Sequence, residues 1–567
     1  MTDAAAIRNS HPDDAVATRI AASALVDPVA QADLPYHAPR WNEPLVFELH
    51  SDGARGLIPA RSDTLDAARL ADSPEGRVRR PRTAQLPEIA QPQVLRHFLR
   101  LSQETLGADL NVDIGQGTCT IKYSPKINEQ FVGSAKVVNT HPLQPVSTAQ
   151  GTLRVIHELE GYLAEISGMD AVSVQAPAGS AAIWGNVQIV RAFHREQGEG
   201  EQRKEVVTTI FSHPSNAAAA RTAGYDVITL YPGEDGLITE EAVRAAVSQR
   251  TAALMITNPE DTGIFNPHID KLVAAAHKVG ALCVYDQANA NGLLGITRAR
   301  DAGFDLCHFN LHKTFSTPHA CGGPAAGAIC ATNELAPYLP GPRVRRDGDR
   351  YRMDPPGPLA TASIRPFYGV IPNLVRAYAW IRALGPDGLE RVAEGAVLSN
   401  NYVLSQISRI PGVHAAYITG DRHPIEQVRY SWSDLTHETG VSSGEIGRRM
   451  ADFGMHYWTS HHPYVVPEPA TIEPTESYSR RELDVYVAAL SRVAAEARAD
   501  ATMVRAAPHR SSVHQVDATH VNDPETWATS WRAFRRKYLG EKLPVPRHWQ
   551  ASADAPANVR PPKAFHR

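Results

Sequence analysis

The segment Leu311-His312-Lys313-Thr314-Phe315 follows directly on a short apolar run, residues 305–310. Three more short apolar runs in this part of the chain also end in polar residues. Short apolar runs of this kind are typical of buried parallel strands, whose ligand sites lie beyond their carboxyl ends. The pattern therefore predicts an α/β protein with a large, mostly parallel sheet. The three runs and their successors are 206–211 with His213-Pro214-Ser215-Asn216, 253–257 with Asn258-Pro259, and 282–285 with Asp286-Gln287-Ala288-Asn289.

Two segments between these runs have helical spacing and end at a glycine. Residues 155–167 are apolar every three or four positions and stop at Gly168. Residues 269–279 repeat the pattern and stop at Gly280, just before the run that leads to the aspartate. Alternating helices and strands are typical of a doubly wound sheet.

Composition restricts the class of protein. The 567 residues are enough for two or three domains, and the 43% apolar and 21% charged shares are ordinary for a soluble globular protein. A net charge of −4 gives no bulk attraction to nucleic acid, and no run approaches the roughly 18 apolar residues of a membrane span. The chain begins with acidic residues, unlike a signal peptide. We expect a cytoplasmic enzyme with reduced thiols and no metal site, because its five cysteines form no C-x-x-C pair and its histidines match no ligand spacing.

Changes in composition along the chain suggest five regions. The first is rich in Ala, Asp and Pro without a sustained period, and the last contains Asp523-Pro524, a good helix start. A helix from there would place Trp527, Trp531, Phe534 and Tyr538 on one face, for docking on its own protein or on an acidic partner. We expect a mobile tail (1–44), an arm that lines the active site (45–130), a large sheet domain (131–375), a smaller C-terminal α/β domain (376–510) and an extension (511–567).

Lys313 and Asp286 together predict a pyridoxal-phosphate site. A lysine holds an aldehyde cofactor as a Schiff base when burial or a neighbouring charge favours its neutral amine. A carboxylate at a strand end supplies the counter-charge for a protonated pyridine ring. The aspartate precedes the lysine by 27 positions (313 − 286), which leaves room for one helix and one strand. Each residue alone has a plain alternative, a solvated lysine or a capping aspartate, but the pair favours the cofactor.

Three further segments are candidates for the same site. Gly179-Ser180 follow the run 171–175 and open a helix, whose N-terminal N–H groups would bind a phosphate. His213 is either a ring stacked over the cofactor or a loop histidine held by hydrogen bonds, and the residues alone leave this open. A polar cluster either lines a carboxylate-binding wall or is an ordinary loop; its members are Thr118, Cys119, Thr120, Lys122 and Tyr123.

Several longer motifs stand in order from about residue 45 to about residue 509. They are Asn310-Leu311-His312-Lys313-Thr314-Phe315 with Pro318-His319 and Gly322-Gly323-Pro324, the segment 117–126, Tyr285-Asp286-Gln287-Ala288-Asn289, Thr257-Asn258-Pro259, Arg343-Val344 and Ile472-Glu473-Pro474-Thr475-Glu476. Together they resemble the pyridoxal-phosphate subunit of glycine dehydrogenase (decarboxylating), the P-protein of the glycine cleavage system. More narrowly, they resemble its C-terminal half, or subunit 2 of the split form.

The resemblance implies a type I fold of pyridoxal-phosphate transferases. It implies Lys313 as the Schiff-base lysine, Asp286 on the pyridine nitrogen and His213 over the ring. The implied reaction releases the carboxylate of glycine as carbon dioxide and passes the aminomethyl group to the lipoyl disulfide of a small carrier, the H-protein. A homodimer, or a heteromer with a subunit like the N-terminal half, is expected. We predict His312 as a further catalytic residue and Asn258 and Ala288 as further cofactor contacts.

Some residues depart from the family pattern near the expected site. Ala181-Ala182-Ile183 replace polar residues after the phosphate loop, and Glu260-Asp261 replace uncharged ones after Asn258-Pro259. These changes favour an alternative, a diverged enzyme that acts on another amino acid by decarboxylation, aldol-type cleavage or amino transfer. A third hypothesis is a non-catalytic scaffold half, against which the retention of Lys313, Asp286 and His213 argues.

Overall fold

The computed structural model describes most of the chain between residues 86 and 510. The described residues are 34, 43–56, 86–107, 109–115, 119–319, 325–361, 363–365, 367–418, 422–459, 465–510, 527–528, 531–538 and 540. The chain forms two compact units, 1–512 and 513–567. The expected mobile tail, 1–44, lies almost entirely outside the described residues.

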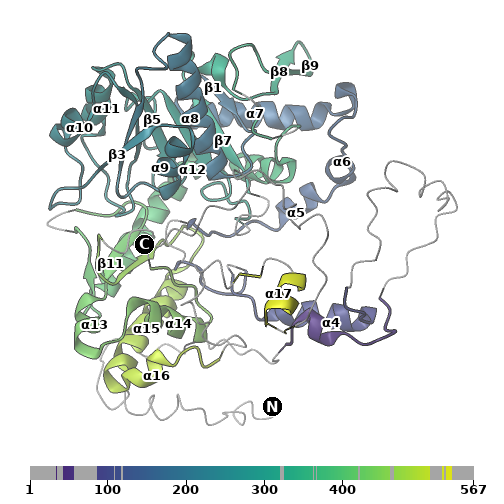
Figure 1. Ribbon diagram of the computed structural model, residues 1–567, viewed down its shortest axis with the longest axis vertical. Coiled ribbons are helices and arrows are strands. Elements are labelled where there is room, and N and C mark those ends of the chain that lie inside the picture. Colours follow the sequence, from purple (N-terminus) through teal and green to yellow (C-terminus); the bar gives the residue numbers. More distant parts are fainter. Residues whose placement is uncertain are drawn as a thin grey trace, which may run out of the picture. The chain divides into compact units, whose positions relative to one another are not determined.

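A seven-stranded sheet forms the centre of the first unit, counted over the described residues (Figure 1). Its order is β1-β7-β6-β5-β4-β2-β3, with β2 to β6 parallel and β7 antiparallel to both of its neighbours. The four apolar runs of the sequence become β2, β4, β5 and β6, so the prediction of a large, mostly parallel sheet is confirmed. The strands are β1 (Ala171–Ser173), β2 (Glu205–Thr209), β3 (Asp226–Leu230), β4 (Thr251–Thr257), β5 (Leu282–Gln287), β6 (Leu306–Asn310) and β7 (Gly327–Ala331).

Helices cover both faces of this sheet because successive strand residues point to opposite sides. One buried cluster joins Leu254 and Cys283 to α7, α10 and α11, and the other joins Ala253 and Val284 to α8 and α9. Gly168 and Gly280 have positive φ where the helices α7 and α11 stop, as their sequence positions predict. The helices are α7 (Gln150–Ser167), α8 (Gly179–Glu196), α9 (Pro214–Thr222), α10 (Glu240–Ala246) and α11 (Ile269–His277).

A third buried cluster, here named the C-terminal core, lies apart from the large sheet (Figure 1). The long helix α12 (Ile371–Ile407) changes direction at Gly385, where φ is 66°. Its residues up to Ala393 pack on the sheet and its last turns pack in the C-terminal core, so the expected boundary at 375/376 falls inside this helix. The core holds β10 (His414–Ala415), β11 (Val428–Ser431), β12 (Pro469–Ile472), α13 (Ser433–Thr439), α14 (Ser443–Asp452), α15 (Arg480–Ala499) and α16 (Ala501–Arg505).

The segment before α7 runs along the C-terminal core. Ile114 is buried in that core, and its carbonyl accepts a hydrogen bond from the Glu473 N–H at 2.8 Å. Residues 119–123 follow it toward the carboxyl edge of the sheet. The remaining elements of this unit are η2 (Val46–Leu49), α4 (Gln91–Gln103), α5 (Ile127–Val132), α6 (Ala135–Val138), η4 (Val146–Thr148), η6 (Ala336–Tyr338) and the hairpin β8 (Arg343–Asp347) and β9 (Arg350–Asp354).

The second unit contains one described helix, α17 (Trp531–Tyr538). The expected helix start at Asp523-Pro524 lies outside the described residues. Trp527 is not helical, so the prediction that a helix passes through it is wrong. Its carbonyl accepts a hydrogen bond from Lys537 Nζ at 3.0 Å, a side-chain partner in place of a helical amide. Across the described chain, no helix combines the length and apolarity that crossing a membrane requires.

Candidate active site

An open pocket lies beyond the carboxyl ends of β2, β4, β5 and β6, where ligands of doubly wound sheets bind. It is partly open to solvent. Four predicted site residues meet here: Lys313, Asp286, His213 and Ala288. The full lining is Phe211, His213, Thr257, Pro259, Glu260, Asp261, Asp286, Ala288, Asn289, Lys313, Glu426 and Gln427.

Asp286 is held as a buried carboxylate. Its Oδ1 accepts the Ala288 N–H at 3.0 Å, and its Oδ2 accepts a hydrogen bond from Asn216 Nδ2 at 2.9 Å. His308, its neighbour across the β5–β6 register, places Nε2 3.2 Å from Oδ1. Burial by itself would raise the pKa of Asp286, but His308 and His213 bring the pKa below its usual value. The ionised form is the one that pairs with a protonated pyridine nitrogen.

Lys313 is buried in the turn that follows β6, with its side chain on the pocket. Its N–H donates to the Asn310 carbonyl at 3.0 Å, and its own carbonyl accepts the Ser316 N–H at 3.2 Å. His312 is not among the lining residues, because its Nδ1 lies 2.8 Å from the Ala326 carbonyl at the start of β7. Burial, with a contribution from Lys313, lowers the pKa of His312 to about 3, so its ring is neutral. This contact anchors the turn after β6 to the residue before β7, and a catalytic role of His312 stays a prediction.

His213 is a loop histidine held by hydrogen bonds, one of the two alternatives that the sequence leaves open. It caps α9 through Nδ1, which accepts the Ser215 N–H at 3.2 Å and lies 2.6 Å from Ser215 Oγ. Its ring nevertheless lines the pocket opposite Asp286. The capping bonds fix the ring, and its stacking over a cofactor stays a prediction.

The start of α8 has the form of an anion cradle. Ala178 precedes Gly179 in extended conformation, and no side chain caps this helix end. The N–H groups of the first turn therefore have no helical acceptor. A Cβ on Gly179 would lie 2.3 Å from Asn310 Oδ1, so only glycine fits beside that amide. The Nδ2 of the same amide also lies beside Gly179, which makes Asn310 a candidate phosphate donor that no local sequence pattern indicated.

Two predicted groups are engaged in other contacts. The Asn258 amide accepts the Asn266 N–H at 2.7 Å and donates to the Asn266 carbonyl at 3.2 Å, which ties the 258–266 loop. Lys122 donates to Asn291 Oδ1 at 2.5 Å and to Glu476 Oε1 at 3.0 Å. Burial lowers the pKa of Lys122, while Glu476 opposes this shift.

The rest of the predicted substrate wall is only partly in view. Thr120 donates to Glu473 Oε1 at 2.8 Å, and Tyr123 is half exposed. Cys119 is partly buried, and Thr118 lies outside the described residues. Contacts of these residues with a substrate stay predictions.

The two acidic residues that depart from the family pattern behave differently. Asp261 forms a buried ion pair with Arg429 of β11 and accepts a hydrogen bond from Gln427 Nε2 at 3.1 Å. Its charge is thereby neutralised within the protein. Glu260 accepts a hydrogen bond from Thr209 Oγ1, and burial raises the pKa of its carboxyl to about 8. Only Glu260 therefore changes the chemistry of the pocket, and at neutral pH it does so as an uncharged acid.

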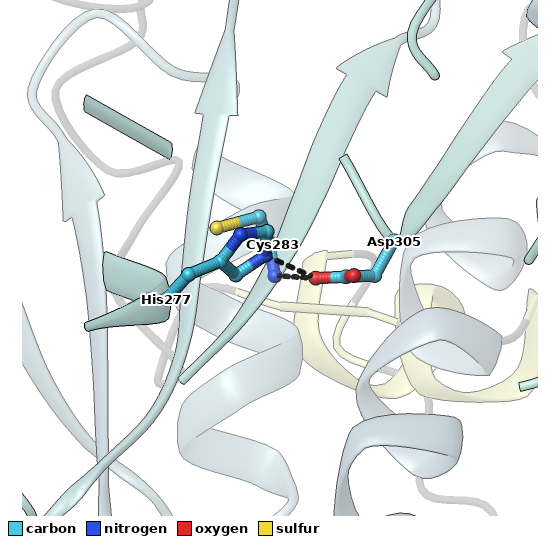
Figure 2. A group of neighbouring side chains, drawn as sticks. All are labelled: His277, Cys283 and Asp305. Carbon is cyan, nitrogen blue, oxygen red and sulfur yellow. Dashed lines mark hydrogen bonds and ion pairs between the residues drawn. The ribbon is translucent and has the colours of Figure 1, made fainter. Parts of the chain in front are cut away.

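A histidine, a cysteine and an aspartate meet at the opposite, amino edge of the sheet. Figure 2 shows Asp305 accepting hydrogen bonds from the Cys283 backbone N–H at 2.7 Å and from His277 Nε2 at 2.9 Å. The ligand atoms of the three residues lie within 4.8 Å of one another. However, the Cys283 thiol donates toward the Val273 carbonyl at 3.7 Å, and burial raises its pKa well above the usual value. Since metals bind the thiolate, we interpret this cluster as a clamp between α11, β5 and β6.

Comparisons with known proteins bear on the whole chain. Residues 392–514 match the family described as "Glycine dehydrogenase, C-terminal domain", and residues 187–322 match "Aminotransferase class-V". A protein of Pyrococcus abyssi described as "Probable glycine dehydrogenase (decarboxylating) subunit 2" is 40% identical over 485 residues, 85% of this chain and 95% of that protein. The chain belongs to this family. A relative from Saccharolobus islandicus with the same description is 34% identical over 88% of this chain and 98% of its own length.

Solved structures agree with the fold. A crystal structure of glycine decarboxylase (P-protein), in inhibitor-bound form, is similar with a TM-score of 0.63 at 19% identity, covering 76% of this chain and 95% of that one. A sphingosine-1-phosphate lyase of Burkholderia pseudomallei is similar with a TM-score of 0.56 at 15% identity, covering 80% and 95%. The fold is therefore the type I fold of pyridoxal-phosphate transferases, as the resemblance implies.

Pyridoxal phosphate is the cofactor of this fold, and the residues present fit it. The pocket combines a buried lysine and a carboxylate held in its ionised form. The start of α8, a helix end without a side-chain cap, is not among the lining residues and lies beside Asn310, at the end of β6. These features correspond to the aldehyde, the ring nitrogen and the phosphate of the cofactor.

Proposed function

We propose that this chain is the pyridoxal-phosphate subunit of a glycine dehydrogenase (decarboxylating). It removes the carboxylate of glycine as carbon dioxide and passes the aminomethyl group to the disulfide of a lipoylated carrier. The observation that carries the proposal is that Lys313 and Asp286 line one pocket, in a chain whose relatives have this description over nearly their whole length. The start of α8 lies beside Asn310, at the end of the strand that leads to Lys313.

Each residue has a distinct task in this reaction. Bound pyridoxal phosphate supplies the electron sink for the pair left by carbon dioxide. The Asp286 carboxylate holds a proton on the ring nitrogen, and the Lys313 amine holds the cofactor by its aldehyde carbon. The N–H groups at the start of α8 and the Asn310 amide bind the phosphate, and the His213 ring limits movement on the exposed side.

The partners follow from the descriptions of the relatives and from the reaction. The relatives are described as subunit 2, so we propose a heteromer with a second subunit that resembles the N-terminal half of long P-proteins. The lipoylated carrier is the second substrate. We propose glycine as the amino acid, because the charge of Asp261 is already neutralised by Arg429 and the pocket gains no fixed charge that would select a charged side chain.

The test is exchange of labelled carbon dioxide into the carboxyl group of glycine, with the lipoylated carrier and the second subunit present. We expect exchange with glycine and with no other amino acid, and we expect Lys313→Ala to abolish it. Lys278→Ala, at an exposed lysine after α11, is the matched control and should exchange at the rate of the unmodified chain. Exchange with a different amino acid would show that this amino acid, and not glycine, is the substrate. Full activity of Lys313→Ala would refute the enzyme assignment.

A further inference from the structure

Two buried glutamates, Glu426 and Glu473, lie on the C-terminal-core side of the pocket; we name them the carboxyl pair. Glu426 lines the pocket together with Lys313. Glu473 is bonded to Asn289, which also lines the pocket. The two glutamates flank the same end of an antiparallel strand pair, because β11 begins at Val428 and β12 ends at its partner Ile472. The pair is therefore fixed by the C-terminal core and faces the cofactor lysine.

Each carboxyl of the pair is held by one oxygen and leaves the other without a partner. Glu473 Oε1 accepts hydrogen bonds from Thr120 Oγ1 at 2.8 Å and from Asn289 Nδ2. The Glu426 carboxyl accepts the Gly292 N–H, and a Cβ on that glycine would lie 3.3 Å from Glu426 Cγ. The second oxygens, Glu426 Oε1 and Glu473 Oε2, are buried and find no hydrogen-bond partner in the described part of the chain. A buried carboxyl oxygen without a hydrogen-bond partner favours the protonated form of its carboxyl group over the charged form.

The electrostatic surroundings agree with a protonated pair. Burial raises the pKa of Glu473 to about 7, against the opposing effects of Thr120, Lys313, Asn289 and Lys122. Burial and the charge of Glu473 raise the pKa of Glu426, and Asp286 adds to this while Lys313 opposes it. Because burial and the charge of Glu473 both raise the pKa of Glu426, the pair retains a proton at neutral pH.

The proposed reaction needs such a proton. When carbon dioxide leaves, the electron pair of the broken carbon–carbon bond ends in a new bond between the glycine α-carbon and one lipoyl sulfur. The sulfur–sulfur bond breaks, and its electron pair goes to the second sulfur, which becomes a thiol by taking up one proton. The carbon is oxidised and the disulfide is reduced, so each turnover consumes one proton.

We propose that the carboxyl pair holds this proton and delivers it to the departing sulfur. The inference rests on the proposed function for its substrate, but the state of the pair is a property of the protein itself. A neutral acid on the pocket wall gives the sulfur a positioned donor. The pair recovers its proton from solvent between turnovers.

Infrared spectroscopy of the full chain with pyridoxal phosphate tests the state of the pair without turnover. The carbonyl band of a protonated carboxylic acid should titrate near neutral pH. We expect Glu473→Gln and Glu426→Gln each to remove part of this band and to shift the remainder, and the double variant to remove both parts. Glu160→Gln is the control, because Glu160 lies on α7 outside the pocket and has a pKa raised by burial to about 8. Glu160→Gln should remove a separate carbonyl band. This loss should be the same whether or not the carboxyl pair is also substituted.

Kinetics test the use of the proton. In the double variant, transfer to the lipoylated carrier should fall by about 100-fold or more, the usual contribution of a positioned general acid. Cofactor binding and the spectral response to glycine should persist, and Glu160→Gln should transfer at the unmodified rate. Unchanged transfer in the folded double variant, or a carbonyl band that none of the pair variants alters, would overturn the proposal. If the unmodified chain decarboxylates no glycine, the proposed function fails, while the infrared result still decides whether the pair is protonated.

Discussion

Two clusters of buried acidic side chains in the described part of the chain differ in how fully their oxygens are bonded. In the C-terminal core, Arg449 lies between Asp452 and Glu496, all three at 0% exposure. Arg449 donates to Asp452 Oδ2 and to Glu496 Oε2, each at 2.8 Å. The remaining oxygens accept bonds from the His509 N–H at 2.7 Å and from Arg492 Nε at 2.8 Å. Every carboxylate oxygen of this cluster has a donor.

The pocket at the carboxyl edge of the sheet has the opposite character. Buried oxygens of Glu426, Glu473, Asn216 and Asn310 lack hydrogen-bond partners among the described residues. Both regions carry the cost of taking polar groups out of water, but only the first recovers it within the protein. The comparison teaches that a saturated buried cluster serves the fold, and that an unsaturated one indicates where a ligand or a proton is bound.

The largest effect is expected in the saturated cluster. Arg449→Met would leave Asp452 and Glu496 buried without their cation, which should cost about 3–5 kcal/mol of unfolding free energy. Chemical denaturation of the full chain measures this change. Folded Arg449→Met protein should bind pyridoxal phosphate as the unmodified chain does. A loss of cofactor affinity without a loss of stability would contradict the assignment of this cluster to the fold.

Asp286→Asn should give the next largest effect, on the pocket and not on stability. Removing the charge opposite the ring nitrogen should weaken cofactor binding by roughly 10- to 100-fold, the equivalent of about 1.5–3 kcal/mol for a hydrogen bond to a charged group. Fluorescence titration with pyridoxal phosphate measures the affinity. Asp305→Asn, at the opposite edge of the same sheet, is the control and should bind the cofactor normally. Equal losses in both variants would mean that the measurement reports folding.

Two glycine substitutions should give smaller effects, one a loss of cofactor affinity and the other a gain in stability. Gly179→Ala places a Cβ against Asn310 at the start of α8 and should lower cofactor affinity about tenfold. Gly161→Ala, on α7 with no atom within 4 Å of the added Cβ, should stabilise the chain by about 0.5–1 kcal/mol. Cofactor titration and thermal unfolding of both variants separate the two effects. Normal cofactor affinity in Gly179→Ala would show that the start of α8 does not bind the phosphate.

The smallest effect is expected at the clamp of Figure 2. The hydrogen bond to Asp305 is the main reason that the pKa of His277 is raised above its usual value of 6.5. The raised pKa contributes stability that is complete below pH 6.5 and is lost as the pH rises through the folded-state value. Because the His277 side chain is 39% exposed, the contribution should not exceed about 1 kcal/mol. Unfolding of His277→Gln across this pH range should lack the step, and an unchanged profile would contradict the assignment.

Much of the fold could be predicted because its signals are local. The strands β2, β4, β5 and β6 are apolar runs with polar ends, and Gly168 and Gly280 mark two helix stops. No specific prediction was made for β7, because its antiparallel place between β1 and β6 is decided by pairing, not by a local pattern. The prediction of a helix through Trp527 was wrong because capping residues and an apolar face indicate only a local preference for helix.

The same distinction applies to the site. Lys313, Asp286 and Gly179 stand at the ends of strands or the start of a helix, where sequence position already indicates the carboxyl edge. Glu473 was noted only as part of a family motif, because its role depends on Thr120, which is 353 positions away. Asn310 was likewise noted only as part of a family motif, because the close approach of its amide to Gly179 depends on packing and has no local sequence pattern.

The most direct test of the central claim is reductive trapping of the cofactor. The full chain is loaded with pyridoxal phosphate, reduced with borohydride and digested, and the modified peptide is identified by mass spectrometry, with and without prior addition of glycine. The pocket geometry predicts a single modified residue, Lys313, and less modification when glycine is present. Modification at another lysine, or none, would contradict the assignment of this pocket as the cofactor site.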